Sequence, residues 1–150
     1  MKKISTLVLS SFLVTSLNAQ TTATDFTVTD CNGISQHLFE KLDSNKVIVM
    51  AWVMPCGSCT GPAKTAYNVA KSYDASNPGR VLYFLVDDYG NTNCTSLSNW
   101  GTSNNISANS VFSSASVSMG DYGSAGMPKV VVLGGGTKHK VYFNEINTDA

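Results

Sequence analysis

The sequence predicts a single α/β domain built on a mixed β-sheet flanked by helices, and three observations support this fold class. Two apolar runs rich in β-branched residues, at positions 46–54 and 80–88, have the pattern of strands buried on both faces. A stripe of Ala and Tyr at intervals of three and four, over residues 63–73, predicts a helix between them, so the two strands should be parallel. Residues 126–146 form two apolar stretches joined by a Gly-rich turn, which predicts an antiparallel hairpin.

Length and composition limit the number of domains and the classes of partner. The chain has 150 residues, of which 43% are hydrophobic, enough for one domain with a substantial core. Its formal net charge is zero, and only 13% of its residues are charged. Because a phosphate backbone is bound mainly by clustered Lys and Arg, nucleic acid is not an expected partner.

The first residues have the layout of a secretory signal peptide. Lys2 and Lys3 precede an apolar stretch over residues 4–17, and Ala19 is the small residue expected at a cleavage site. We therefore predict a signal peptide at residues 1–19 and a mature domain at residues 20–150. The mature protein is expected to be periplasmic or secreted, in an oxidising compartment, with no stable membrane insertion after cleavage. The alternative is an N-terminal anchor or a buried helix, although the stretch is short and rich in Ser and Thr for a membrane span.

The remaining segments complete the order of elements. Residues 26–39 alternate apolar and polar side chains around an Asn-Gly pair, which predicts an N-terminal β-hairpin extension. A weaker helix is expected over residues 94–105, after the second apolar run. Residues 106–125 are rich in Ser, Asn and Gly, and we predict a long loop there with one helical turn around residues 111–119.

Two cysteines three positions apart, Cys56 and Cys59 in the sequence CGSC, stand where the first apolar run ends and the helix begins. A zinc site needs a second pair of ligands at short spacing, and neither the other cysteines nor the two histidines supply one. A structural disulfide across so short a loop would restrict the unfolded chain little. At a helix start, backbone N–H groups and the helix dipole favour thiolate over thiol at Cys56. The pattern therefore favours a redox pair, in which Cys59, one turn further on, resolves a mixed disulfide.

Taken together, these segments resemble the thioredoxin-like proteins, and within them the secreted redoxins related to TlpA. The resemblance extends from "FTVTDCNG" through "VIVMAWVMPCGSC" to "GMPKVVVL", nearly the whole of the predicted mature chain. It implies a thioredoxin-like fold in which Cys56 is the exposed nucleophile and Cys59 the resolving cysteine. It also implies that Pro128, which follows Met127, is a cis-proline packed against the active-site disulfide. The Met127 backbone would then be free to pair with an extended substrate segment.

The chain departs from this family at positions that bear on function. Pro55 stands before the first cysteine, where many members have Trp, and it removes a backbone donor from the expected substrate-binding surface. The Asp that thioredoxins bury in the strand before the motif is absent from residues 48–51. Asp87 and Asp88 end the second apolar run, and we interpret them as solvated strand-end residues. The sequence therefore identifies no proton acceptor for Cys59.

The last strand also lacks the helix that the resemblance implies after it. With the final helix missing from the predicted fold, one face of the closing hairpin is expected to be uncovered. Val141 and Phe143 would lie on this face. We expect a longer gene product or a partner to cover them.

The other two cysteines, Cys31 and Cys94, are predicted to form a structural disulfide. Leftover cysteines in an exported protein are more often paired than free. In the thioredoxin-like arrangement, an N-terminal strand can lie parallel to the second buried strand, which would bring Cys31 and Cys94 to one end of the sheet. A competing hypothesis is a relay that passes electrons from Cys56 through these thiols.

The predicted function is that of an exported thiol-disulfide oxidoreductase that exchanges disulfides through Cys56 and Cys59. Its expected partners are protein thiols or disulfides as substrates and a redox partner protein. The sequence has no flavin, nicotinamide or metal motif, so no cofactor is expected. One alternative is a non-catalytic thioredoxin-like module that binds a partner within a larger secreted protein. The other is a thiol peroxidase, although Val53 stands where the related peroxidases have Thr.

Overall fold

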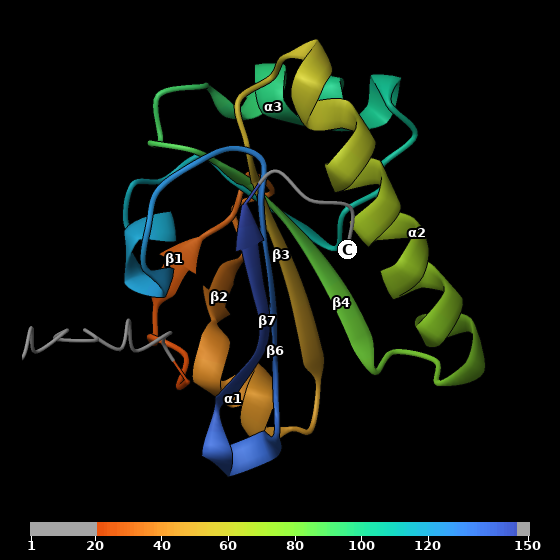
Figure 1. Cartoon of the computed structure of the whole chain (residues 1–150), viewed down its shortest axis with the longest axis vertical. Coiled ribbons are helices and arrows are strands. Elements are labelled where there is room, and N and C mark those ends of the chain that lie inside the picture. The colour runs from red at the N-terminus through yellow and green to blue at the C-terminus, as the bar shows by residue number, and fades with distance from the viewer. Residues whose placement is uncertain (1–20, 147–150) are drawn as a thin grey trace, which may run out of the picture.

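The computed structural model of the chain describes residues 21–146 and confirms the predicted α/β fold with a mixed sheet. The main sheet consists of β3 (Val47–Val53), β4 (Val81–Asp87), β5 (Ser110–Phe112), β6 (Lys129–Gly134) and β7 (Lys140–Ile146). These strands lie in the order β5-β4-β3-β6-β7, and Figure 1 labels all of them except β5. β3, β4 and β5 are parallel, whereas β6 is antiparallel to β3 and β7 is antiparallel to β6. The predicted closing hairpin is therefore β6 and β7.

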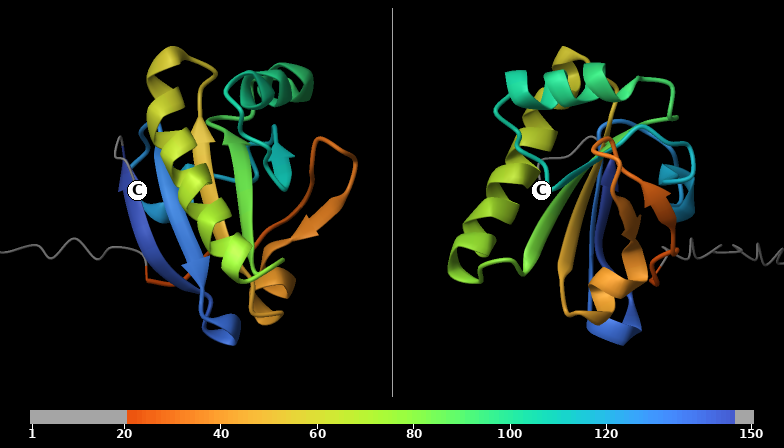
Figure 2. Two further views of the ribbon diagram at one scale, coloured as in Figure 1. Left: turned by 90° about the vertical axis from the view of Figure 1, so that its right-hand side faces the viewer. Right: turned by 180° about the vertical axis from the view of Figure 1, so that it is seen from behind.

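Helices and a separate hairpin cover the two faces of this sheet. The described helices are α1 (Leu38–Asp43), α2 (Thr60–Ser76) and α3 (Cys94–Ser103), with the 3-10 turns η1 (Gly57–Cys59), η2 (Met119–Tyr122) and η3 (Gly136–Lys138). The hairpin consists of β1 (Thr27–Thr29) and β2 (Ser35–His37). As predicted, a helix, α2, connects β3 to β4, and it lies along one face of the sheet, with α1 and the hairpin on the other (Figure 2).

The central strand β3 contributes to two cores because its side chains alternate between the faces of the sheet. Three of them are buried on the face that α1 and η2 cover: Ile48, Met50 and Trp52. Three others are buried on the α2 face: Val49, Ala51 and Val53. The buried side chains of α2 itself are Ala63, Ala66 and Ala70. Their small size lets the helix pack closely against this face of the sheet.

The predicted N-terminal hairpin is confirmed, and Asp30 organises its turn. β1 and β2 pair antiparallel, and Gly33 between them has a φ of 78°, which glycine adopts without strain. The buried Asp30 carboxylate accepts hydrogen bonds from the backbone N–H groups of Asn32 and Ile34 and from the Gln36 side chain. The hairpin forms its own two-stranded sheet, so the expected place of the N-terminal strand beside β4 is wrong.

On the side away from β3, β4 pairs with β5, which lies in a region predicted as a loop. Residues 106–125 contain both β5 and η2, and the helical turn expected around residues 111–119 lies instead at Met119–Tyr122. β5 has only three residues, too few to show a period in the sequence. Tertiary contacts specify it instead, because the buried Phe112 ring packs edge-on against the rings of Phe26 and Phe84.

Val141 and Phe143 do not form one uncovered face, contrary to the expectation from the sequence. A β-bulge interrupts the pairing of β7 with β6, so that Val141 lies opposite Leu133 and Phe143 opposite Val132. The extra residue changes the alternation of side chains along the strand. Val141 is consequently half-buried against the core on the α1 face, and Phe143 is half-buried against the core on the α2 face.

The predicted signal peptide at residues 1–19 lies outside the described residues. The described chain begins at the edge of β7, where Thr22 forms a β-bridge with Lys140 and the Val141 N–H donates to the Thr21 carbonyl. Within residues 21–146, no helix is long and apolar enough to cross a membrane.

Candidate functional site

The CGSC segment lies at the carboxyl end of the central strand. β3 ends at Val53, and Cys56 has an extended backbone, with φ −138° and ψ 166°, immediately before η1 and α2. Cys56 and the preceding Pro55 are half-buried, whereas Cys59 is only 2% exposed. The buried strand thus fixes the start of the motif, and the first helical turns bury its second cysteine.

The two cysteines have different environments and therefore different acidities. Both are free thiols, with their sulfur atoms 3.2 Å apart. The Ser58 hydroxyl lies 3.1 Å from the Cys56 sulfur, and this hydrogen bond, followed by that of Cys59, lowers the pKa of Cys56 below its usual value. Burial raises the pKa of Cys59 to about 11, and the contact with Cys56 adds to the rise. Cys56 is therefore the more readily ionised thiol. The sequence-based candidates do not include Ser58, although a hydroxyl between two cysteines is itself a signal for such a bond.

The loop with Met127 and Pro128 approaches the motif from the neighbouring strand. β6 pairs with β3 so that Lys129 lies opposite Trp52, which places Pro128 and Met127 beside the end of β3. The Met127–Pro128 peptide bond is cis, Pro128 is buried, and Met127 is half-buried. Met127 and Cys56 both pack against the core on the α2 face. The candidate residues at this end of the sheet are Pro55, Cys56, Cys59, Met127 and Pro128.

Lys129 anchors this loop from inside the protein. Its side chain is only 2% exposed, and Nζ donates hydrogen bonds to the carbonyl groups of Tyr122 and Ser124. Asn144 on β7 donates to the same Tyr122 carbonyl. Burial lowers the pKa of Lys129. The segment before Met127 is thus tied to both strands of the closing hairpin, a role that the sequence analysis did not identify.

Asp87 and Asp88 are buried, which corrects their interpretation as solvated strand-end residues. Asp87 is 0% exposed and Asp88 is 6% exposed. One Asp87 oxygen accepts hydrogen bonds from the backbone N–H groups of Asn91 and Thr92, in the loop that follows the strand. Among the described residues, no partner bonds the other Asp87 oxygen or the Oδ1 atom of Asp88. Burial raises the pKa of Asp88, and the charge of Asp87 raises it further.

Cys31 and Cys94 are joined by a disulfide, with their Cα atoms 5.3 Å apart. Cys31 follows β1, and its backbone N–H donates to the carbonyl of Val111 on β5. Cys94 is the first residue of α3. β5, and not an N-terminal strand beside β4, therefore brings the two cysteines together. The bridge does not involve the CGSC thiols, which are free.

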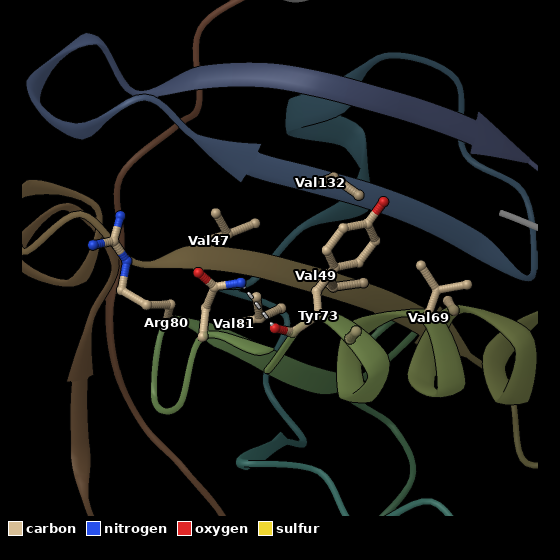
Figure 3. A pocket seen from close by; sticks show the side chains of 10 residues that line it. Val47, Val49, Val69, Tyr73, Arg80, Val81 and Val132 are labelled. Carbon is tan, nitrogen blue, oxygen red and sulfur yellow. Dashed lines mark hydrogen bonds between the residues drawn. The ribbon is translucent and has the colours of Figure 1, made fainter. Parts of the chain in front are cut away.

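An apolar groove of about 440 Å³ lies on the α2 face, towards the opposite end of β3 from the motif. Figure 3 shows it between α2 and the sheet, with valines of β3, β4 and β6 along its floor. Val69 and Tyr73 of α2 form its outer side. The described residues that line it include no cysteine and no carboxylate, so it is not a candidate for thiol chemistry. Within residues 21–146, no three His, Cys, Asp or Glu side chains are grouped to hold a metal ion.

Several solved proteins have a similar fold. The thioredoxin domain of a thiol-disulfide oxidoreductase from Bacteroides vulgatus matches with a TM-score of 0.65 and 16% identity, over 89% of this chain and 92% of that chain. A secreted disulfide oxidoreductase of Mycobacterium tuberculosis, homologous to DsbE of E. coli, matches with a TM-score of 0.60 and 16% identity, over 83% of this chain and 87% of that chain. A thioredoxin-like protein from Aeropyrum pernix matches with a TM-score of 0.65 and 8% identity, over 83% and 82% of the two chains.

The sequence itself matches no family model and no curated protein. At identities this low, the structural matches establish the fold and not the activity. The mixed sheet, the hairpin ahead of it and the extent of these matches agree with the fold class that the sequence predicts. The chain therefore has the thioredoxin-like fold.

Proposed function

We propose that this protein is an exported thiol-disulfide oxidoreductase that exchanges disulfides through Cys56 and Cys59. The observation that carries the proposal is the difference between two thiols whose sulfur atoms are 3.2 Å apart. Cys56 is partly accessible and has a lowered pKa, whereas Cys59 is buried with its pKa raised to about 11. A thiolate is the attacking species in disulfide exchange, so this difference supports attack by Cys56 and resolution by Cys59.

The proposed exchange has two steps. The Cys56 thiolate attacks a substrate disulfide, forming a mixed disulfide while one substrate sulfur leaves as a thiolate. Cys59 then loses its proton and attacks the Cys56 sulfur, which releases the second substrate sulfur and leaves a Cys56–Cys59 disulfide. The reverse sequence oxidises substrate thiols. A redox partner protein must return the pair to its starting state, and no cofactor takes part.

Substrate contact is assigned to the residues that border Cys56. Met127 and Pro128 lie beside the end of β3, and Pro55 precedes Cys56. An extended substrate segment would pair with the Met127 backbone, which supplies affinity without requiring one substrate sequence. Pro55 has no N–H group, so it borders the segment without donating a hydrogen bond to it.

The proposed location is the periplasm or the extracellular medium, after removal of residues 1–19 as a signal peptide. The domain would then be residues 20–150. The Cys31–Cys94 disulfide supports an oxidising compartment, because structural disulfides are rare where thiols are kept reduced. One of the structurally similar proteins is itself a secreted disulfide oxidoreductase.

The experiment that tests the function is capture of the mixed disulfide. Cys59→Ser, incubated with a disulfide-containing peptide, should accumulate a covalent adduct at Cys56 that a reductant removes, because the resolving thiol is absent. Cys56→Ser is the matched control and should form no adduct there. Mass mapping checks both variants. If Cys56 resists labelling after mild reduction and the wild type turns over no substrate, the function as an oxidoreductase is excluded, and a non-catalytic binding module takes its place.

The direction of exchange follows from the reduction potential of the CGSC pair. A value above about −200 mV indicates an oxidant or isomerase, and a value near about −270 mV indicates a reductant. Equilibration with glutathione or dithiothreitol buffers measures it.

A further inference from the structure

The loop that carries Met127, residues 123–127, is closed by a side chain from the strand that follows it. Lys129 is the first residue of β6, and its Nζ atom donates hydrogen bonds to the carbonyl oxygens of Tyr122, at 2.9 Å, and Ser124, at 2.8 Å. Tyr122 is the last residue of η2, so both carbonyl groups belong to the beginning of the Met127 loop. The Lys129 side chain thus joins the end of the loop to its beginning.

The strand β7 holds the same loop from the side. Ile146 on β7 lies opposite Lys129 on β6 and close to Gly126. A Cβ atom on Gly126 would lie 2.6 Å from the Cγ2 atom of Ile146, well inside the separation of about 3.5–4.0 Å at which two carbon atoms pack. The Gly126 N–H also points to the Met119 sulfur, 3.4 Å away. The residue before Met127 therefore has little room to move.

Lys129 places a charge inside the protein without an ion pair. Its side chain is 2% exposed, and none of the salt bridges within residues 21–146 includes it. Transfer of an ammonium group out of water costs free energy that burial of an apolar side chain does not. An apolar side chain, however, could not bond two carbonyl groups. What the ammonium group supplies is therefore a defined conformation of the Met127 loop.

The Met127 loop lies at the same end of the sheet as Cys56. Lys129 pairs with Trp52 on β3, four residues before Cys56, and both Met127 and Cys56 pack against the core on the α2 face. A backbone segment can bind an extended polypeptide tightly only if its own N–H and C=O groups are already in place. A loop that became ordered on binding would lose affinity to the entropy of ordering.

We propose that Lys129 is a positioning residue for the substrate. Its two hydrogen bonds, together with the contact of Ile146 with Gly126, hold the Met127 backbone ready to pair with an extended polypeptide. Lys129 is buried and acts through the loop, so it affects the affinity for polypeptide disulfides and not the reactivity of Cys56. Small disulfides have no backbone to pair and should not respond to it. The inference rests on the proposed function, because it explains how the same site binds its substrate.

Two reagents with the same leaving group separate affinity from reactivity. One is a short extended peptide whose only cysteine carries a 2-thiopyridyl group, and the other is 2,2′-dithiodipyridine, which has no peptide backbone. With either reagent, the Cys56 thiolate attacks a sulfur atom, a new S–S bond forms, and the thiopyridine leaves as coloured thiopyridone. The parent protein for these measurements is the reduced full chain with Cys59→Ser, in which only this first attack takes place.

Lys129→Met should weaken the reaction with the peptide alone. The peptide concentration that gives half of the maximal rate should rise about tenfold, as expected for the loss of one or two backbone hydrogen bonds, while the maximal rate and the rate with 2,2′-dithiodipyridine stay within about twofold. Asp30→Asn is the matched control, because Asp30 is also a buried charged residue but organises the turn of the N-terminal hairpin. It should change neither reaction.

Two further measurements test the position of the loop directly. A peptide methylated on the backbone nitrogens beside its cysteine should bind the parent more weakly than the unmethylated peptide, whereas Lys129→Met should bind both alike. Gly126→Ala displaces the loop without altering Lys129 and should weaken peptide binding in the same way. Ile146→Ala, added to Gly126→Ala, removes the carbon that the new Cβ would meet and should restore binding.

Unchanged peptide affinity in Lys129→Met overturns the inference, and so does an equal loss of peptide affinity in Asp30→Asn. Equal slowing with the peptide and with 2,2′-dithiodipyridine would mean that Lys129 acts on Cys56 itself, which also rejects the inference. If Lys129→Met does not fold, Gly126→Ala and the methylated peptide decide, and the absence of either effect is a rejection. Failure of Cys56 in the parent to react with either reagent would instead refute the proposed function, so the two failures are distinguishable.

Discussion

Each cysteine of the CGSC segment owes its acidity to different neighbours. Cys56 stands before the helical turns and is bonded by the Ser58 hydroxyl, which favours its thiolate. Cys59 points into the core on the α2 face, where burial favours its thiol. Two identical side chains three positions apart are thus made chemically unequal by one hydroxyl group and one helical turn.

Removal of the Ser58 hydroxyl should make Cys56 less acidic. In Ser58→Ala, the pKa of Cys56 should rise because its thiolate loses its leading hydrogen bond. Alkylation of Cys56 by iodoacetamide at pH 7 should therefore be slower than in the wild type, and the two should converge at high pH. Ser58→Thr retains a hydroxyl and serves as the control. Identical pH profiles for Ser58→Ala and the wild type would show that the hydroxyl has no such role.

Replacement of the buried lysine should destabilise the fold and alter its pH dependence. Lys129→Met leaves the Ser124 carbonyl without its donor and removes one of two donors to Tyr122, which should lower the free energy of unfolding by about 2 kcal/mol. The unfolded chain holds the Lys129 proton more tightly than the folded protein does, so wild-type stability should rise as the pH rises from the lowered pKa towards 10.5. Lys129→Met should lack that rise in urea titrations over the same range. An unchanged pH dependence would contradict this account.

At the residue scale, the sequence predicts the positions of the candidate cysteines better than it predicts which polar side chains are buried. The CGSC spacing and the apolar strand before it locate Cys56 and Cys59, whose catalytic roles stay predictions. The burial of Asp87 and Asp88 depends on the loop after β4, and that loop has no periodic pattern from which its path follows. The burial of Lys129 depends likewise on the carbonyl groups of a loop.

At the scale of elements, the N-terminal hairpin is attached to the rest of the protein by different chemistry at its two ends. Near its turn, the Cys31–Cys94 disulfide joins it to α3. At its other end, His37 lies 2.7 Å from Asp25 and 3.2 Å from Glu40, where β2 continues into α1. The first attachment is covalent and independent of pH, whereas the second depends on the charge of an imidazole.

Loss of the disulfide should cost stability without removing the CGSC chemistry. The bridge joins positions 63 residues apart, and closing a loop of that length stabilises the fold by about 4 kcal/mol in the chain-entropy model. The double variant Cys31→Ser/Cys94→Ser should show this loss in denaturant titrations, while Cys56 still forms adducts with disulfide peptides. A variant that is as stable as the wild type would contradict the structural role. Loss of Cys56 reactivity in a folded variant would favour the electron relay.

The contacts of His37 with Asp25 and Glu40 should make the free energy of unfolding depend on pH near neutrality. Hydrogen bonds to Asp25 and then to Glu40 raise the pKa of His37 above 6.5. The folded protein therefore binds this proton more tightly than the unfolded chain, and the resulting stability is fully present below pH 6.5 and lost as the pH rises through the raised pKa. His37→Gln should remove this part of the pH dependence in denaturant titrations between about pH 5 and pH 9. A wild-type stability that is flat over that range would contradict the prediction.

At the scale of the whole molecule, one sheet separates two cores of different character. The α1 face is filled by large side chains, among them Trp52, Phe84 and Phe112, whereas the α2 face is closed largely by alanines and leaves the apolar groove beside them. The sequence predicts the central strands because both faces are apolar along their whole length. It does not predict β5 or the bulge in β7, because each depends on contacts with distant residues and not on a local pattern.

Polar substitution at the rim of the groove should leave the fold intact. Tyr73 is 63% exposed, so Tyr73→Gln removes little buried area and should change the free energy of unfolding by less than about 0.5 kcal/mol. Ala66→Gln is the contrasting control. Ala66 is only 1% exposed and packs in the core between α2 and the sheet, so a longer side chain would force the helix outward. Thermal unfolding checks both. Equal destabilisation by the two changes would show that the rim is part of the core.

The disulfide between Cys31 and Cys94 closes a ring in the chain, and Cys56 and Cys59 lie inside that ring. Four cysteines can pair in three ways, and the pairing compatible with this structure is the nested one. In chain order, both CGSC thiols come before Cys94, so they are the first partners that Cys31 can meet as the chain emerges into an oxidising compartment. A disulfide between Cys31 and either of them must be broken by another thiol before the native bridge can form. The order of the four cysteines thus makes the CGSC thiols competitors of Cys94 for Cys31.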